Sequence, residues 1–309
     1  MQAENVRDPR KWAELAQRAE ASGYASFLIP DHLSRLSTFP MLMAAAAATS
    51  RITLSTYVLN QDFRPPGVLA QEAASVHILT DGRLELGVGA GWAKREYAQA
   101  GLQFDPAGVR VARFEEYLQV LKGLFTATEP YSFDGRFFQL DNYRPLPKHA
   151  RPLPILAAGG SPRILAISGR LADIISVSTP ATPDGRVDMP KISRQAVENK
   201  VGWIRTAAAD RLPEIELNMT VRDVRLTNDR PAAARQLLAE WASVPERLAH
   251  VEQITEEDVL NSPHIALGTV EQIVEQFEEA RERWGFSYLE VGSNDADAIA
   301  EVLPRLAGR

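Results

Sequence analysis

The feature that most constrains the fold is a repeated alternation of helical and strand-like segments. An amphipathic stretch at Pro9–Ala21 ends at Gly23 and is followed by the apolar run "ASFLIP", which predicts a buried strand. Helical segments at 41–49, 68–79, 109–125, 162–171, 191–209 and 270–284 are each followed by a similar run, which gives seven predicted strands. Such units form a parallel sheet buried on both faces, either closed as a barrel or open with helices on both sides. The pattern alone leaves both architectures open.

Length and composition favour one domain over residues 1–309. The chain has 309 residues, of which 45% are hydrophobic and 24% charged, so it can bury a large core. No low-complexity tract or linker divides the sequence, and no strict repeat accompanies the alternation. We therefore predict a single domain.

Charge and composition exclude several classes of function. A net charge of −6 and a pI of about 5.5 argue against nucleic-acid binding. The absence of cysteine excludes disulfides and thiolate chemistry, and the histidines show no i,i+4 pairing, so we expect no metal site. The longest apolar run, which begins at Met41, is far shorter than the ~20 residues of a membrane span. We expect a cytoplasmic protein that binds a small molecule and neither nucleic acid nor a membrane.

Two segments interrupt the alternation. Residues 130–150 alternate aromatic and polar side chains around Asp134-Gly135, which predicts a β-hairpin. Residues 179–190 form a loop rich in proline and glycine. Because loops that follow strands lie at the catalytic face of a barrel enzyme, this loop is a candidate lid. A tolerated surface loop explains its length equally well.

The stretch "LELGVGAGWAKREY" at residues 84–97 carries three glycines in five positions. A dinucleotide-binding loop would need a further glycine three positions after Gly89, and the residue there is Trp92. That interpretation fails. Glycine at the end of a strand permits close approach of a ligand to the backbone, but it also relieves crowding within a barrel.

Two further motifs indicate binding and proton transfer. In "AAGGSPRIL", Ser161 suits a helix N-cap and Pro162 the first helical position, where backbone N–H groups bind phosphate. Capping alone does not require the two preceding glycines. Asp31-His32 ends the predicted strand "ASFLIP", a position at which barrel enzymes place catalytic groups. Histidine is the side chain best suited to proton transfer near neutral pH, although a lone histidine is more often structural.

Five stretches in series resemble the bacterial luciferase-like superfamily, and within it the branch that uses the deazaflavin coenzyme F420. They are "IPDHL", "STYVLNQDFRPP", "LTDGRLELGVGAGWAKREY", "PLPILAAGGSPRILAISGRLADIISV" and "LGTVEQIVEQFEEARERWGFSYLEV". The resemblance runs over nearly the whole chain. It implies a TIM (β/α)8 barrel with insertions, which the alternation only permits.

The resemblance also implies roles for individual residues. His32 would be the proton donor or acceptor, and Asp31 a coenzyme contact or the group that orients His32. Trp92 would line one side of the binding site for the coenzyme ring or pack in the core. Glu96 would orient a polar coenzyme atom or occupy the first turn of a helix. A non-proline cis peptide is expected at Tyr57–Val58. The other expected coenzyme contacts are Asn60, for which a turn-forming role is the alternative, and Gly89, Gly91, Ala158, Gly159, Gly160 and Ser161.

The implied activity is transfer of a hydride between F420 and a small organic molecule, with the chemistry supplied by the coenzyme. The alternatives are an FMN-dependent monooxygenase and a barrel that binds a cofactor without catalysis. Sugar-phosphate dehydrogenases of this family carry a tryptophan shortly after the Asp-His pair and a glutamate where this chain has Trp92. The pair is followed here by Leu33, Ser34, Arg35 and Leu36, which favours a less polar substrate.

By analogy with luciferase-like barrels, we expect a homodimer formed through the helices at 41–49 and 68–79. An eight-stranded barrel also needs a strand before its first helix, and only residues 1–6 are available for it ahead of the helix start at Asp8-Pro9. We therefore expect a truncated first strand, reduced to a stub of two or three residues at most.

Overall fold

The computed structural model describes residues 1–3, 6–33, 35–182 and 184–306. The chain folds into two compact units. The N-terminal unit comprises residues 5–158 and 170–174, and the C-terminal unit comprises residues 1–4, 159–169 and 175–309. Each unit has its own parallel strands and its own helices.

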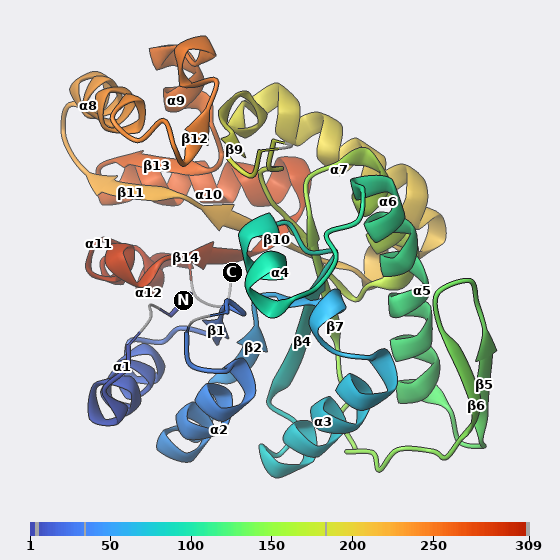
Figure 1. Ribbon diagram of the computed structural model, residues 1–309. Coiled ribbons are helices and arrows are strands. Elements are labelled where there is room, and N and C mark those ends of the chain that lie inside the picture. Colours follow the sequence, from blue (N-terminus) through green and yellow to red (C-terminus); the bar gives the residue numbers. More distant parts are fainter. Residues whose placement is uncertain (4–5, 34, 183, 307–309) are drawn as a thin grey trace. The chain divides into compact units, whose positions relative to one another are not determined.

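The core of the N-terminal unit is a parallel sheet with the strand order β1-β2-β4-β7. The strands are β1 (Ser26–Ile29), β2 (Thr53–Thr56), β4 (Leu84–Gly89) and β7 (Ile155–Gly159). The helices are α1 (Pro9–Ala21), α2 (Thr38–Ala48), α3 (Pro66–Leu79), α4 (Lys94–Ala100) and α5 (Ala107–Thr126). α2 and α3 pack beside β2 and β4, as Figure 1 shows.

The start of α1 shows how local chemistry defines an element. The Asp8 carboxylate accepts hydrogen bonds from the backbone N–H groups of Arg10 and Lys11, and Pro9 occupies the first turn. One face of the helix, which includes Trp12 and Leu15, is buried. The predicted bounds of this helix are confirmed.

The strand predicted after the helical segment at 41–49, the run "RITLSTYVL" at residues 51–59, is divided in two. β2 ends at Thr56, a cis peptide bond joins Tyr57 and Val58, and β3 (Leu59–Asn60) then pairs with the end of β4. The cis bond is the one that the resemblance implied, and it is confirmed. The Asn60 side chain accepts from the N–H of Asp62 and opens the 3-10 helix η1 (Gln61–Phe63), so Asn60 does have a turn-forming role.

The predicted hairpin is also present. β5 (Tyr131–Asp134) and β6 (Gln139–Tyr143) are antiparallel, and the hairpin lies beside α5 (Figure 1). The Glu116 carboxylate on α5 accepts from the backbone N–H groups of Arg136 and Phe137 in its turn. The turn is therefore fixed to the helix that precedes it.

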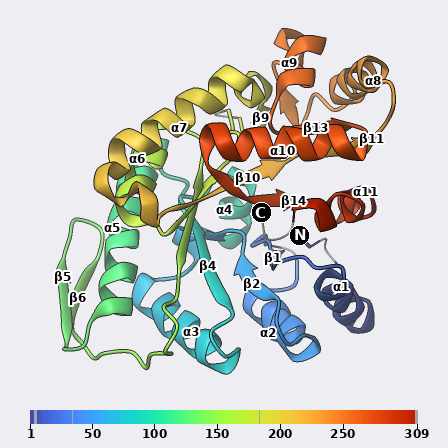
Figure 2. The same cartoon turned by 180° about the vertical axis from the view of Figure 1, so that it is seen from behind.

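The C-terminal unit contains β10 (Glu216–Val221) and β14 (Phe286–Val291), which pair in parallel. α10 (Val270–Trp284) lies beside β14 and β13 (Ile265–Gly268), as Figure 2 shows, and β13 pairs with β11 (Asp223–Leu226). Further elements are β8 (Ile174–Val177), α6 (Pro162–Leu171), α7 (Arg194–Ala208), η3 (Ala209–Glu214), α8 (Arg230–Ala242), η4 (Val251–Gln253), α9 (Glu256–Asn261), η5 (Ser293–Asp295), α11 (Ala296–Ala300) and α12 (Leu303–Leu306).

Two predicted segments of this unit differ from the structure. The single strand expected after the helical segment at 191–209, over residues 214–224, is β10 followed by β11, and the two strands have different partners. The helix expected at 191–209 begins at Arg194, because the Ser193 side chain caps it by accepting from the N–H of Ala196. The 3-10 helix η2 (Met189–Ile192) precedes it.

Several hydrogen bonds hold the described residues of the loop at 179–190. β9 (Val187–Asp188) pairs in parallel with β12 (Leu248–Ala249), and the N–H of Thr182 donates to the carbonyl of Arg186 at 2.8 Å. The Lys200 amine on α7 donates to the carbonyl oxygens of Ser178 and Lys191, the residues that flank the loop. The interpretation of this loop as a lid stays a prediction.

The predicted first strand is represented among residues 1–3 by Gln2, which forms an isolated parallel bridge with Gly292. The N–H of Gln2 donates to the carbonyl of Val291, and the N–H of Ser293 donates to the carbonyl of Gln2. Met1 and Ala3 are buried on either side of it. Residues 4 and 5, which belong to the same segment, lie outside the described residues.

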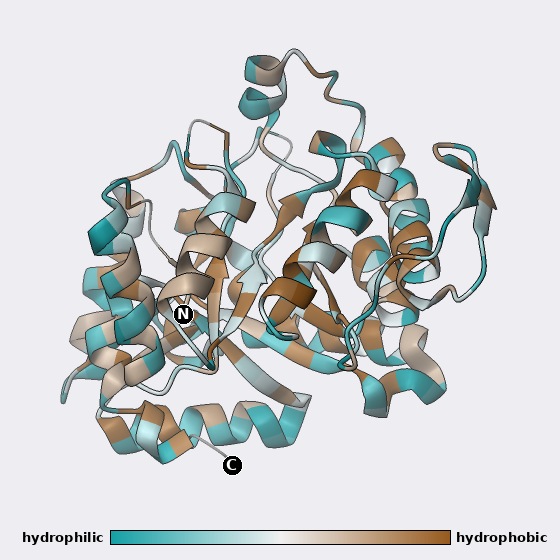
Figure 3. Cartoon of the chain, turned by 90° about the horizontal axis from the view of Figure 1, so that it is seen from below, coloured by the Kyte–Doolittle hydropathy of each residue, from teal (hydrophilic) through white to brown (hydrophobic). Residues whose placement is uncertain are grey.

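Buried hydrophobic residues occur on the strands and on one face of many helices. In Figure 3 the strands near the middle of the view carry brown and pale segments, whereas the helices carry both brown and teal segments, as expected for helices with one buried face. Among the described residues, none of the helices combines the length and the apolar character that a bilayer crossing requires.

Candidate functional site

The His32 ring contacts the Glu96 carboxylate in the N-terminal unit. Its Nδ1 atom lies 2.7 Å from Oε1 of Glu96, and the two side chains are 29% and 17% exposed. His32 follows β1, and Glu96 lies in the first turn of α4, the helical position that the sequence allowed for it. Because a carboxylate can only accept, Nδ1 carries the hydrogen and the other ring nitrogen, Nε2, is left for proton exchange.

Asp31 has different partners from the adjacent histidine. Its carboxylate accepts from the Thr38 hydroxyl at 2.9 Å, from the backbone N–H of Asn60 at 3.2 Å and from Nη1 of Arg64 at 3.0 Å. Asp31 thereby joins the ends of β1 and β3 to the start of α2. The carboxylate in contact with His32 is that of Glu96.

Trp92 stands beside His32 and is 54% exposed. The two rings are nearly perpendicular, with centroids 6.3 Å apart and an interplanar angle of 88°. The alternative that Trp92 packs in the core is therefore wrong. An exposed aromatic ring next to a histidine provides a surface on which a flat or apolar ligand can lie.

Contacts with the protein's own atoms require glycine at the last residue of β4, Gly89, and at Gly91 just after it. A Cβ at Gly89 would lie 2.9 Å from Cγ2 of Val58. Gly91 has φ +74°, and a Cβ there would lie 2.0 Å from the Tyr97 hydroxyl and 2.6 Å from Oδ1 of Asn60. Relief of crowding thus accounts for both positions. Close approach of a coenzyme ring to them stays a prediction.

Tyr97 is a residue of this site that the sequence did not single out. Its hydroxyl donates to Oδ2 of Asp62 at 2.7 Å and lies 3.0 Å from Oδ1 of Asn60. Burial, together with the Asp62 carboxylate, raises the pKa of Tyr97, so the hydroxyl keeps its proton. Arg113 pairs with the other oxygen of Asp62 at 2.6 Å and also with Asp105.

Arg110 holds the chain where it leaves β4. Its guanidinium donates to the carbonyl oxygens of Ala90 and Gly91, and Nε donates to the carbonyl of Asp105 at 3.0 Å. The guanidinium also lies 4.2 Å from the centroid of the Phe104 ring, a cation–π contact. Sequence reasoning missed this arginine because two of its partners are backbone carbonyls 20 and 19 residues away in the chain.

The glycine pair predicted to contact phosphate lies in the C-terminal unit, whereas Ala158 belongs to the N-terminal unit. α6 begins at Pro162, as predicted, and the N–H of Leu165 donates to the carbonyl of Ser161. A Cβ at Gly160 would lie 2.4 Å from the carbonyl oxygen of Ser178, and one at Gly159 would lie 2.1 Å from Cγ2 of Ile164. Both glycines therefore allow close packing at the start of α6, and the phosphate contact stays a prediction.

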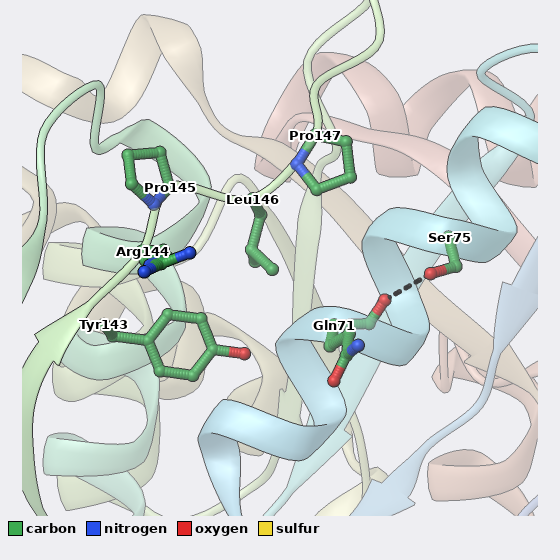
Figure 4. Close-up of a pocket in the computed structure, with 7 residues that line it drawn as sticks. All are labelled: Gln71, Ser75, Tyr143, Arg144, Pro145, Leu146 and Pro147. Carbon is green, nitrogen blue, oxygen red and sulfur yellow. Dashed lines mark hydrogen bonds between the residues drawn. The ribbon is translucent and has the colours of Figure 1, made fainter.

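A groove of about 380 Å³ lies elsewhere in the N-terminal unit (Figure 4). Gln71 and Ser75 of α3 form one side, and residues 143–147 form the other. The Tyr143 hydroxyl donates to the carbonyl of Gly67 at 2.9 Å. None of the predicted site residues lines this groove, so we do not assign the candidate site to it.

Two F420-dependent enzymes are similar to this chain in sequence. An F420-dependent glucose-6-phosphate dehydrogenase of Nakamurella multipartita is 31% identical over 258 residues, which cover 79% of this chain and 72% of that protein. A protein of the same name from Amycolatopsis mediterranei is 31% identical over 174 residues, and the match spans only 52% of its length.

Two solved structures share the fold along nearly the whole chain. An F420-dependent secondary alcohol dehydrogenase in complex with an F420–acetone adduct has a TM-score of 0.75 at 21% identity, covering 99% of this chain and 98% of that one. The coenzyme F420-dependent tetrahydromethanopterin reductase of Methanopyrus kandleri has a TM-score of 0.74 at 19% identity, with the same coverage. These likenesses confirm the predicted luciferase-like TIM-barrel fold. Residues 1–288 also match the family described as luciferase-like monooxygenase. The chain therefore belongs to the luciferase-like monooxygenase family.

Proposed function

We propose that this protein is an oxidoreductase that transfers a hydride between coenzyme F420 and a small organic substrate. The observation that carries the proposal is the contact between His32 Nδ1 and Glu96 Oε1 beside the exposed ring of Trp92. The names of the relatives support the choice of coenzyme, since those of both dehydrogenases and both solved structures include F420.

The residues present fit such a coenzyme. When bound, the deazaflavin supplies a ring carbon that donates or accepts a hydride. In the N-terminal unit, Trp92 and His32 offer an aromatic surface and a proton-transfer group.

His32 moves the proton that must accompany hydride transfer to or from an alcohol or carbonyl. With Nδ1–H donated to Glu96, Nε2 accepts a proton from a substrate hydroxyl or returns it to a carbonyl oxygen. The Glu96 carboxylate fixes the orientation of the ring and stabilises the imidazolium that forms. The ring is only 29% exposed, which limits exchange of this proton with bulk water.

We propose a substrate less polar than a sugar phosphate. Trp92 is exposed beside His32, and Leu36, which follows the Asp-His pair, is exposed as well. An indole ring and an aliphatic side chain favour apolar surface and offer no charge for a phosphate. A small secondary alcohol, or the corresponding ketone, has the required chemistry.

The test is turnover of F420 by the purified protein with a panel of alcohols and ketones, followed by the absorbance of the coenzyme. The variant His32→Ala should lower kcat by about 10²–10⁴-fold, the usual contribution of a general acid or base. His149→Ala is the matched control, because His149 pairs with Asp81 outside the candidate site and should leave turnover unchanged.

Two other results would replace this proposal. Oxygen consumption that depends on reduced FMN and not on F420 would establish the FMN-dependent monooxygenase. Coenzyme binding with rates that His32→Ala leaves unchanged would establish a barrel that binds a cofactor without catalysis.

We also propose a homodimer in the cytoplasm. The outer face of α3 exposes Val68 (50%) and Leu79 (72%), and α2 contains no charged residue and exposes Ala44 and Ala47. Exposed apolar side chains on neighbouring helices favour pairing with a second copy. Sedimentation at the monomer mass across micromolar concentrations would contradict the dimer.

A further inference from the structure

α4 is attached to the rest of its unit through very few side chains. The helix has seven residues, and Tyr97 is its only buried residue. A helix of this length is not stable by itself in water, so its position depends on tertiary contacts. Two of its side chains make contacts of this kind in the candidate site. Tyr97 makes them with its ring and hydroxyl, and the adjacent Glu96 contacts His32.

The partners of Tyr97 form a rigid base. The ring packs against Phe63 and Phe104, with centroids 5.6 and 4.9 Å away. The hydroxyl contacts the side chains of Asn60 and Asp62, and Arg113 of α5 holds Asp62 from its other side. The hydroxyl is therefore fixed by groups that belong to β3, η1 and α5, and not to α4.

The chain before α4 is shaped to admit this hydroxyl. Gly91 lacks the Cβ that would lie 2.0 Å from it, and Arg110 holds the carbonyl oxygens of Ala90 and Gly91. Residues 91–97 are thus fixed at both ends, by Arg110 at the first and by Tyr97 at the last. Glu96 lies one residue before the second of these anchors.

We propose that Tyr97 is a positioning residue whose hydroxyl sets α4 so that the Glu96 carboxylate meets Nδ1 of His32. Loss of the hydroxyl releases the only buried side chain of the helix from Asp62 and Asn60, and the Glu96–His32 contact loosens with it. The catalytic consequence rests on the proposed function, because it requires His32 to move a proton. The positioning itself is a property of the protein without coenzyme.

The test is the tautomer of the neutral His32 ring, measured by 15N NMR of the ring nitrogens in coenzyme-free protein. The wild-type ring should carry its hydrogen on Nδ1, because Glu96 accepts it there. Glu96→Ala removes that acceptor and should shift the ring towards the Nε2–H form. Tyr97→Phe keeps the buried ring of residue 97. It should raise the fraction of the Nε2–H form of His32 by at least half as much as Glu96→Ala does.

Two further variants make the result specific. Asp62→Ala removes one acceptor of the hydroxyl while Tyr97 is intact, so it should shift the tautomer in the same direction by a smaller amount. Tyr143→Phe is the matched control, since it removes a tyrosine hydroxyl bonded to the carbonyl of Gly67 at the separate groove, and it should change nothing. A wild-type tautomer in Tyr97→Phe, or one that Glu96→Ala leaves unchanged, would overturn the proposal.

Kinetics separate this proposal from the proposed function. In the F420 assay, Tyr97→Phe should lower kcat by about tenfold and leave KM for the coenzyme unchanged. If His32→Ala leaves turnover unaffected, the proposed function fails while the tautomer measurement still decides the role of Tyr97. If turnover requires His32 but Tyr97→Phe keeps the wild-type tautomer and kcat, only the positioning role fails.

Discussion

At the scale of single residues, the geometry of the site depends on a glycine that leaves space for polar side chains. Gly91 adopts φ +74° and leaves the space that the Tyr97 hydroxyl and Asn60 occupy. Any larger residue there must displace a hydroxyl that donates to a buried carboxylate. The cost of substitution should therefore exceed the ordinary cost of a positive φ.

Gly91→Ala should destabilise the protein more than Gly101→Ala. Gly101 has φ +69°, and a Cβ there would meet no atom of the described residues within 4 Å, so alanine adds only backbone strain, about 1 kcal/mol. At Gly91 the same strain is joined by the loss of the Tyr97 hydrogen bonds, about 1 kcal/mol or more. Urea unfolding of the two variants measures the difference. An equal loss of unfolding free energy in the two variants would show that the Tyr97 hydroxyl can move without a free-energy cost.

The sequence predicts some of these residues and not others. His32 and Asp31 could be placed at the end of a strand because the apolar run before them is clear. The partner of His32 could not be assigned, since α4 has one buried residue and hence no apolar periodicity that would locate it. Tyr97, Arg110 and Arg113 depend on contacts between distant segments, which a pattern along the chain does not contain.

At the scale of elements, the helices predicted most accurately are those with strong terminal signals. α10 begins at a capping box formed by Thr269 and Gln272 and ends at Gly285, which has φ +89°. α6 begins with Ser-Pro. The sequence analysis did not predict α8, although Asp229 caps it, and two of its four buried residues are alanines, which give a weak apolar pattern. The division between β10 and β11 follows from their different partners, and pairing of this kind is tertiary information.

The contact between the end of α1 and the backbone of residues 50–52 should weaken at acid pH. The Glu20 carboxylate at the end of α1 accepts from the backbone N–H groups of Ser50, Arg51 and Ile52. Burial alone would raise the pKa of Glu20, but these hydrogen bonds lower it to about 2. Because the folded pKa lies below the unfolded value of 4.5, the stabilisation is complete above pH 4.5 and is lost as the pH falls through about 2.

Glu20→Gln should therefore lower the free energy of unfolding at pH 7 by about 1 kcal/mol, a value that allows for solvent screening. A glutamine offers one acceptor oxygen and turns an NH2 group towards backbone donors. The difference from wild type should shrink as the pH is lowered from 4.5. Glu14→Gln, on the exposed face of the same helix, is the control. A pH-independent difference would contradict the assignment to the charged carboxylate.

At the scale of the whole molecule, the free energy of unfolding should depend on the protonation of the buried Lys200 amine. Lys200 is 1% exposed, and burial lowers its pKa to about 7, with Arg222 and Lys191 adding to the effect and Asp188 opposing it. A neutral amine keeps two N–H donors, enough for the carbonyl oxygens of Ser178 and Lys191. Between pH 7 and 10.5 the unfolded chain binds a proton here that the folded chain does not.

The free energy of unfolding should thus rise with pH across this window, relative to Lys200→Met, which keeps the apolar stem and lacks the amine. The gain is complete above the unfolded value of 10.5 and is lost as the pH falls through about 7. Urea unfolding at pH 7, 8 and 9 measures it, with the exposed Lys94→Met as control. Parallel curves for wild type and Lys200→Met would show that the amine stays charged in the folded protein.

The whole-molecule claim is that this member of the luciferase-like family uses the deazaflavin coenzyme. The most direct measurement is the affinity of the purified protein for F420 and for FMN, determined side by side by calorimetry in the same buffer. We predict a dissociation constant for F420 at least about tenfold lower than that for FMN, a difference of about 1.4 kcal/mol. Equal affinities, or tighter binding of FMN, would contradict the account.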